Sequence, residues 1–155
     1  RDRCYQEKYY FNQPKNSFKF FDIGKFRIGI LICWDQWYAR SYEYMRKNNV
    51  NLIICPTAIG FCKIKNKNIS LRGEREKWLN VITANSLMIN TPVVICNRIG
   101  TESDKDHSIS FWGASFITDS SGTVVKKCLT DQRVIHHKIA IEDQITAKSM
   151  WNFID

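Results

Sequence analysis

Long apolar runs, closely spaced cysteine pairs and repeats are the features that this sequence lacks. No apolar run approaches the roughly 20 residues of a membrane span, and no secretory signal opens the chain, so no membrane association is expected. No C-x-x-C pair occurs, and Cys55 and Cys62 lie seven residues apart, which disfavours a zinc site. No internal repeat, low-complexity linker or initiator methionine is present, so we expect one compact unit that is a fragment or a trimmed product.

The composition is that of a basic globular protein. The 155 residues suffice for one domain with a sizeable core, and 44% of them are hydrophobic and 25% charged. The net charge of +8 is compatible with nucleic-acid binding, but the basic residues are scattered. Their densest group (Lys63, Lys65 and Lys67) alternates with asparagine, as is typical of a solvated loop. Without an RNP, zinc-finger or glycine-rich motif, no nucleic acid is expected as a partner.

Six cysteines, at positions 4, 33, 55, 62, 96 and 128, are enough for three disulfides. However, Cys33, Cys55 and Cys96 end or lie within apolar, strand-like runs, and not in the loops of a small disulfide-stapled scaffold. We therefore expect reduced thiols and a cytoplasmic protein.

The order of apolar runs and helical patterns predicts an α/β layered fold. Strands are predicted over 18–23, 26–33, 50–56 and 92–96. The first two form a hairpin around a tight turn at Gly24-Lys25, and the strand over 26–33 is expected to be covered on both faces. Helices are predicted over 38–49 and over 70–90, the latter capped by Ser70, and a loop over 57–69. Further strands over 114–120, 124–129 and 133–141 and a short helix over 142–150 complete the prediction.

Cys33 occupies a position in which a thiol can act as a nucleophile. It ends the apolar run 26–33, and a helix is predicted to begin about five residues later. The carboxyl end of a strand is where open α/β folds form their ligand crevices. Backbone N–H groups at a helix start can lower a thiol pKa and bind an oxyanion. The alternative is a small structural cysteine in the core.

Four motifs occur in order along the chain: GILICWDQW (29–37), LIICPTAIG (52–60), VVICNRIG (93–100) and SFWGASFITDSSGTVV (110–125). Together they resemble the nitrilase (carbon-nitrogen hydrolase) superfamily, and within it the N-carbamoylputrescine amidohydrolases. The resemblance runs from about Tyr5 to Trp151. It implies part of an α-β-β-α sandwich of the nitrilase type, with residues 1–155 as the C-terminal portion of a single domain. It also implies a homo-oligomer that cleaves an amide or ureido C–N bond through a cysteine thioester, without a metal or cofactor.

The resemblance assigns roles to three residues of the chain. Cys33 would be the nucleophile, and the backbone N–H of Trp34 would form part of the oxyanion hole. The stretch CYQEKYYF implies that Glu7 is the family's fourth, supporting carboxylate, with a surface loop acid as the alternative. The family's general-base Glu and its Lys would precede this stretch, and Lys8 lies on the wrong side of Glu7. Either a separate N-terminal portion supplies them, or the chain is a non-catalytic fragment or scaffold.

Residues near Cys33 and at nearby strand ends are the candidates for substrate contacts. The WDQW stretch (34–37) has one carboxylate and no cation, which favours an ammonium-bearing substrate. Asp35 and Glu102 are the candidate carboxylates, although Asp35 is equally suited to capping the following helix. The other candidates, which follow strands or resemble a pocket aromatic, are Thr57, Ala58, Asn97 and Trp112, the last with core packing as its alternative. The expected substrate is N-carbamoylputrescine, cleaved to putrescine, CO2 and ammonia.

Overall fold

The structure, a computed structural model, describes residues 4–12, 18–70, 72–128 and 134–150. One sheet contains β1 (Lys19–Ile23), β2 (Phe26–Ile30), β3 (Leu52–Thr57), β6 (Val93–Asn97), β9 (Phe116–Thr118) and β10 (Val124–Lys127). A second sheet contains β4 (Gly60–Ile64), β5 (Lys67–Asn68), β7 (Ile99–Asp104) and β8 (His107–Trp112). The helices are α1 (Glu7–Tyr10), the 3₁₀-helix η1 (Cys33–Trp37), α2 (Ala39–Lys47), α3 (Glu74–Ile89) and α4 (Ile141–Met150).

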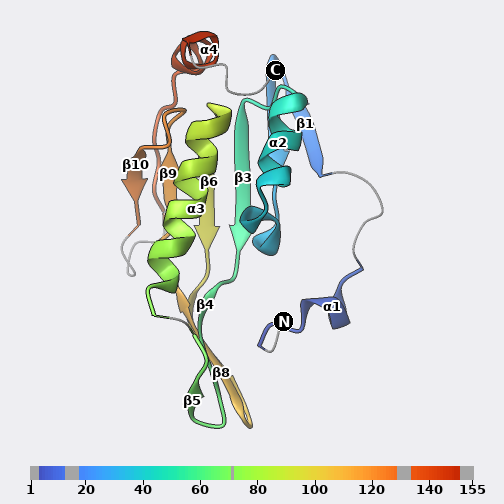
Figure 1. Cartoon of the computed structure of the whole chain (residues 1–155), viewed down its shortest axis with the longest axis vertical. Coiled ribbons are helices and arrows are strands. Elements are labelled where there is room, and N and C mark those ends of the chain that lie inside the picture. The colour runs from blue at the N-terminus through green and yellow to red at the C-terminus, as the bar shows by residue number, and fades with distance from the viewer. Residues whose placement is uncertain (1–3, 13–17, 71, 129–133, 151–155) are drawn as a thin grey trace.

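The six-stranded sheet has the order β1-β2-β3-β6-β9-β10. Its centre is parallel, because β3 pairs in parallel with both β2 and β6. Parallel neighbours need crossover connections, and α2 and α3 provide them. Both helices lie on the same face of the sheet (Figure 1). The predicted hairpin is confirmed, since β1 and β2 pair antiparallel around the Gly24-Lys25 turn.

The main core lies between this sheet and the two helices. Ile53, Cys55 and Val93 of the sheet are fully buried, and they form one cluster with Met45 of α2 and Trp78 of α3. β2 contributes Gly29 to the same face, where an added Cβ would collide with the sulfur of Met45. A larger residue at this position would therefore displace the end of the Met45 side chain from its place in the core.

The opposite face of the sheet is less covered than the sequence predicts. Residues alternate between faces along a strand, so the neighbours of the fully buried positions point away from the helices. Phe21 and Ile23 are 45% and 55% exposed, and Ile28 and Ile30 of β2 are only partly buried. The prediction that both faces of β2 are covered is thus wrong for the described residues, because α2 and α3 cover the same face of the sheet. We call this surface the open face; it consists of Phe21, Ile23, Ile28, Ile30, Ile54, Val94 and Cys96.

The smaller sheet, with the order β5-β4-β8-β7, was not predicted. Residues 57–69 were expected to form a loop, but they contain β4 and β5. In Figure 1, β4, β5 and β8 extend beyond the carboxyl ends of β3 and β6. Backbone hydrogen bonds hold this sheet together, because β4 and β7 each pair with β8. Its strands lack the clear apolar alternation that would have predicted the sheet from the sequence.

Several predicted boundaries also change. Helix α3 begins at Glu74 after Gly73, whereas Ser70, the predicted cap, accepts a hydrogen bond from the Cys62 N–H (2.7 Å). The predicted strand over 133–141 is wrong, because residues 134–140 form no regular secondary structure and no neighbouring strand pairs with them. Residue 133, and residue 129 at the end of the predicted strand 124–129, lie outside the described residues.

The C-terminal helix is confirmed as α4, and it lies at the amino ends of β3 and β6 (Figure 1). Gln144 fixes it there: its side chain is 1% exposed and donates to Val50 O (3.4 Å) and Thr91 Oγ1 (3.3 Å). In the part of the chain that the structure describes, every helix is too short or too polar to cross a membrane.

Candidate active site

Cys33 lies where the chain turns from strand to helix at the carboxyl edge of the parallel strands. β2 ends at Ile30, three residues before the predicted end of the strand, and Cys33 is the first residue of η1. The φ angle of Cys33 is +45°, in the left-handed region that non-glycine residues rarely adopt. Such strain persists where surrounding contacts over-determine the conformation, and it clusters at functional sites. The side chain is half-buried.

Three predicted site residues surround the Cys33 thiol. Burial raises the pKa of this thiol, and the Glu7 carboxylate raises it further. The Ala58 backbone and the Thr57 side chain favour the thiolate and act in the opposite direction on the pKa. The net shift of the pKa is upward, opposite to the shift that a helix start alone would produce. The structure therefore brings together Cys33, Glu7, Thr57 and Ala58, although their chemical roles stay predictions.

The segment that carries Glu7 is tied to β4 at two points. The Tyr5 hydroxyl accepts a hydrogen bond from Gly60 N and donates one to Gly60 O, both at 3.0 Å. Cys4 forms a disulfide with Cys62, with a Cα–Cα distance of 6.4 Å that is usual for such bonds. The expectation that all cysteines are reduced thiols is therefore wrong for this pair. The two residues are 58 positions apart in the sequence, so only the fold reveals their proximity.

Gln36 lies beneath Cys33 and was missed by the sequence analysis. Its side chain is fully buried. Its amide nitrogen donates to Cys33 O (2.5 Å) and to Thr57 Oγ1 (2.6 Å). Its amide oxygen accepts from the indole N–H of Trp78 (2.8 Å). The available sequence signal was a glutamine flanked by aromatic residues next to the candidate nucleophile.

The two residues that follow Cys33 are placed differently from each other. The Asp35 carboxylate accepts a hydrogen bond from the Ile32 N–H (3.0 Å), so it caps η1, the short helix in which it lies. The alternative interpretation, a cap on the following helix, is wrong, because α2 begins after Tyr38 without a side-chain cap. The Trp34 side chain is 46% exposed and donates from Nε1 to the Tyr38 hydroxyl (3.0 Å). Its backbone N–H belongs to the first turn of a helix, where N–H groups have no intrahelical acceptor. The oxyanion role of Trp34 and the substrate role of Asp35 stay predictions.

The structure gives the remaining candidates other partners. The Asn97 side chain accepts from Ile59 N (2.9 Å) and donates to Gly113 O (2.8 Å), and thereby joins two connections at the edge of the sheet. Glu102 is exposed on β7 and forms an ion pair with Arg98. Substrate contact by Asn97 or Glu102 therefore stays a prediction without a supporting contact.

Trp112 is 4% exposed and packs against the rings of Phe61 and Trp78, each with a centroid distance of 5.5 Å. This contact supports core packing, the alternative interpretation of Trp112. Its indole N–H has no hydrogen-bond partner among the described residues.

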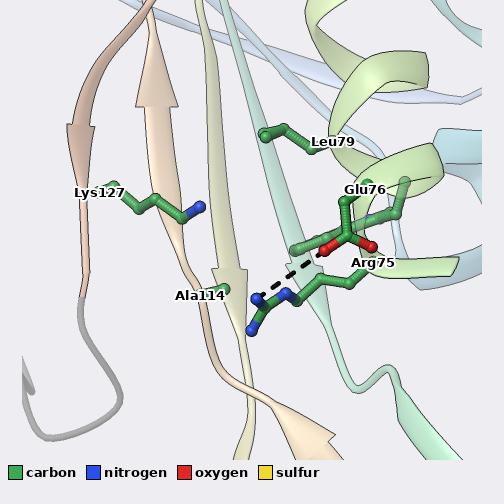
Figure 2. Close-up of a pocket in the computed structure, with 6 residues that line it drawn as sticks. Arg75, Glu76, Leu79, Ala114 and Lys127 are labelled. Carbon is green, nitrogen blue, oxygen red and sulfur yellow. Dashed lines mark ion pairs between the residues drawn. The ribbon is translucent and has the colours of Figure 1, made fainter. Parts of the chain in front are cut away.

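A separate pocket lies at the start of α3, where Figure 2 shows Arg75 and Lys127 pointing into it from different elements. Its lining consists of Arg75, Glu76, Trp78, Leu79, Ala114 and Lys127. Arg75 and Glu76 are 4.0 Å apart as an exposed ion pair. None of the site residues predicted from the sequence lines this pocket, so it is distinct from the site around Cys33. Among the described residues, no cluster of three or more His, Cys, Asp or Glu side chains could hold a metal ion.

Curated relatives match most of this chain over less than half of their own length. N-carbamoylputrescine amidase of Oryza sativa subsp. japonica is 36% identical over 126 residues, which are 79% of this chain and 40% of that enzyme. Citrullinase of Francisella tularensis subsp. tularensis is 33% identical over 118 residues, which are 76% of this chain and 40% of that enzyme. The chain thus spans about two fifths of the length of these curated relatives.

A solved structure and a family model agree with these matches. The carbon-nitrogen hydrolase from Helicobacter pylori G27 superposes with a TM-score of 0.84 at 26% identity, over 95% of this chain and 51% of that one. This similarity confirms the predicted α/β fold of the nitrilase type. The model of the carbon-nitrogen hydrolase family matches residues 2–148. This chain belongs to the carbon-nitrogen hydrolase family.

Proposed function

We propose that a protein containing this chain hydrolyses a non-peptide C–N bond through a thioester on Cys33. The observation that carries the proposal is the left-handed turn that presents the Cys33 thiol beside Glu7, Thr57 and Ala58. The Cys33 sulfur would attack the carbonyl carbon, and the C–N bond would break as the nitrogen leaves with a proton. Water would then cleave the thioester and restore the thiol.

The proposed reaction needs a base that removes the thiol proton. Burial and the Glu7 carboxylate raise the pKa of Cys33, so the uncharged thiol dominates at neutral pH. The proposal assigns proton removal, and a cation for the developing oxyanion, to the Glu and Lys that the family resemblance implies outside residues 1–155. The same raised pKa favours the alternative, in which residues 1–155 alone serve as a non-catalytic scaffold of the nitrilase fold.

The proposed substrate is N-carbamoylputrescine, which has a ureido group at one end and an ammonium at the other. Two relatives support a ureido substrate by their names, N-carbamoylputrescine amidase and citrullinase. Citrulline carries a carboxylate beside its ammonium, and a carboxylate binds best to a cation such as arginine. The WDQW stretch after Cys33 contains a carboxylate and no cation, and Arg98 is already paired with Glu102. These features favour the cationic substrate.

Substitution of Cys33 in an active protein that includes this chain tests the proposal. We expect Cys33→Ala to abolish hydrolysis of N-carbamoylputrescine and to leave the circular dichroism spectrum unchanged. Cys96→Ala is the matched control, because Cys96 is a free thiol near the carboxyl end of β6 in the same sheet. Mass spectrometry of the quenched enzyme should detect the acyl adduct on Cys33. Retained turnover by the Cys33→Ala variant would reject the proposed mechanism.

Substrate choice is measured separately. The ratio of kcat/KM for N-carbamoylputrescine to kcat/KM for citrulline should exceed tenfold if the citrulline carboxylate, left without a cationic partner, costs about 1.5 kcal/mol. A preference for citrulline would reject the choice of substrate and retain the thioester mechanism.

A further inference from the structure

We propose that Gln36 is a positioning residue, which holds the Cys33–Trp34 peptide so that the Trp34 N–H points to the oxyanion formed at Cys33. This inference rests on the thioester mechanism proposed above and assigns a role to a residue outside the predicted site. It starts from the hydrogen bond between the Gln36 side chain and the Cys33 carbonyl oxygen.

The orientation of the Gln36 carboxamide is fixed by its surroundings. An indole N–H can only donate, so Trp78 Nε1 must face the amide oxygen of Gln36. The amide nitrogen is thereby turned to Cys33 O and Thr57 Oγ1. Trp78 is itself immobilised, because it is 1% exposed and packs against Trp112 and Phe116, each with a centroid distance of 5.5 Å. Helix α3 therefore determines the direction of the Gln36 donor.

Planarity of the peptide bond transmits this direction to Trp34. The carbonyl oxygen of Cys33 and the N–H of Trp34 belong to one trans peptide, so they point in opposite directions. Gln36 draws the carbonyl toward the buried side, and the Trp34 N–H must therefore point to the other side. Rotation of this peptide about its two flanking Cα atoms would turn the Trp34 N–H away, and the Gln36 hydrogen bond to Cys33 O opposes that rotation.

Gln36 also acts on the thiol through Thr57. A hydroxyl group that accepts from the Gln36 amide keeps its own proton free to donate. The Thr57 side chain in turn hydrogen-bonds to the Cys33 sulfur in the direction that favours the thiolate. Gln36 thus contacts both the Cys33 carbonyl, which fixes the direction of the Trp34 N–H, and the Thr57 hydroxyl, which hydrogen-bonds to the Cys33 sulfur.

Two reactions of Cys33 separate the positioning role from a merely structural one. Acylation by p-nitrophenyl acetate passes through an oxyanion and releases p-nitrophenolate, whereas alkylation by iodoacetamide displaces iodide at a saturated carbon and forms no oxyanion. Because loss of one oxyanion donor lowers rates by about 10²–10³-fold, we expect Gln36→Leu, in an active protein that includes this chain, to slow acylation about 100-fold and alkylation less than about threefold.

The chain offers a matched control for this substitution. Gln144 is also a buried glutamine with backbone and hydroxyl partners, but it lies on α4 at the amino ends of the strands (Figure 1). Gln144→Leu should lower the melting temperature about as much as Gln36→Leu and change neither rate by more than about twofold, because both variants leave buried polar groups unpaired. Equal slowing of acylation by the two variants would overturn the proposal.

A second variant covers the case in which Gln36→Leu does not fold. Trp78→Phe keeps an aromatic ring in the packed cluster but removes the N–H that orients the Gln36 carboxamide. We expect the ratio of acylation to alkylation rate to fall about tenfold, as for partial loss of an oxyanion donor. An unchanged ratio of acylation to alkylation rate in the folded variants, whether or not both reactions are slowed, would overturn the positioning role. In a protein that supplies the general base, equal release of p-nitrophenolate before and after the Cys33→Ala substitution would reject the proposed function itself.

Discussion

The Cys33 sulfur lies between groups with opposing effects on its charge. Burial and the Glu7 carboxylate disfavour the thiolate, and the Thr57 hydroxyl and Ala58 backbone favour it. A nucleophile in this environment stays protonated until a base removes its proton during the reaction. The arrangement therefore fits a site in which a general base removes the thiol proton during the reaction, in contrast to cysteine sites that hold a permanent thiolate.

Replacement of Glu7 by glutamine should make Cys33 more reactive at neutral pH. The substitution removes a negative charge near the sulfur, and both the charge and the hydrogen bond of Glu7 raise the thiol pKa. We expect the pH midpoint of Cys33 alkylation by iodoacetamide to move to lower pH in Glu7→Gln. Glu43→Gln is the control, because Glu43 pairs with Lys47 on the surface of α2. A midpoint that stays unchanged or moves upward in Glu7→Gln would contradict this assignment.

Cys55 should make the stability of the fold sensitive to alkaline pH. Burial raises its pKa from 9.0 to about 12, so between these values the folded state keeps a proton that the unfolded state loses. The contribution of Cys55 to the free energy of unfolding is therefore complete below a pH of 9.0. It falls as the pH rises above that value, by up to about 1.4 kcal/mol per pH unit.

Urea unfolding at several pH values tests this dependence, with Cys55→Ala as the comparison. The variant should lose part of the alkaline decline in unfolding free energy and keep the part due to Cys33 and Tyr42, whose pKa values burial also raises. Identical pH dependence in the two proteins would show that Cys55 does not titrate as expected.

At the scale of elements, the short helix α1 depends on connections to β4. The Cys4–Cys62 disulfide and the Tyr5–Gly60 hydrogen bonds hold the segment that brings Glu7 to the site. Cross-linking residues 58 positions apart is expected to stabilise the fold by about 4 kcal/mol in the chain-entropy model. The segment itself provides little other burial, since Tyr9 and Tyr10 are exposed.

Reduction of this disulfide should lower the melting temperature and release Glu7 from Cys33. We expect a phosphine reductant to shift the alkylation midpoint of Cys33 in the same direction as Glu7→Gln, and to have no effect on a Cys4→Ser/Cys62→Ser double variant. The double variant without reductant should match the reduced chain in both measurements. A melting temperature that does not respond to reductant would argue against a stabilising link.

The sequence predicts the central elements well because apolar patterning determines them. The runs that become β2, β3 and β6 are apolar, and the carboxyl ends of parallel strands share one edge, so the proximity of Cys33 and Thr57 could be predicted. Most of β7 is exposed and polar, and the pairing of β8 with β4 and the packing of Trp112 against Trp78 depend on remote segments. Residues 134–140 show the converse, since their apolar alternation suggests a strand but no strand pairs with them.

The candidate site is predicted less completely than the fold. Cys33 follows β2, Thr57 is the last residue of β3 and Ala58 follows it, so simple topology brings them together. Gln36 contacts Cys33 only because η1 turns its side chain inward to Trp78, 42 residues further along the chain. Disulfide pairing and the Gln36 hydrogen bonds depend on distances between remote segments, which spacing along one sequence does not contain.

At the scale of the whole molecule, the six-stranded sheet has one face covered by helices and an open face. The open face carries aliphatic and aromatic side chains, of which Phe21 and Ile23 are among the most exposed. Contiguous apolar surface of this kind usually marks an interaction site or drives association. The homo-oligomer expected from the sequence, or a separate N-terminal portion, would have to cover it, and either partner is a proposal.

The final prediction is that the 155-residue chain alone associates through the open face and does not hydrolyse ureido substrates. Phe21→Glu should weaken self-association in sedimentation velocity, because a charge on an apolar interface must be desolvated without a partner. Met88→Glu is the matched control, since Met88 is 51% exposed on α3 and Phe21 is 45% exposed on the sheet. Weaker association of Met88→Glu alone would place the contact on the helical layer. A monodisperse monomer that hydrolyses N-carbamoylputrescine would contradict both parts, since burial of the open face would then be unnecessary for a working site.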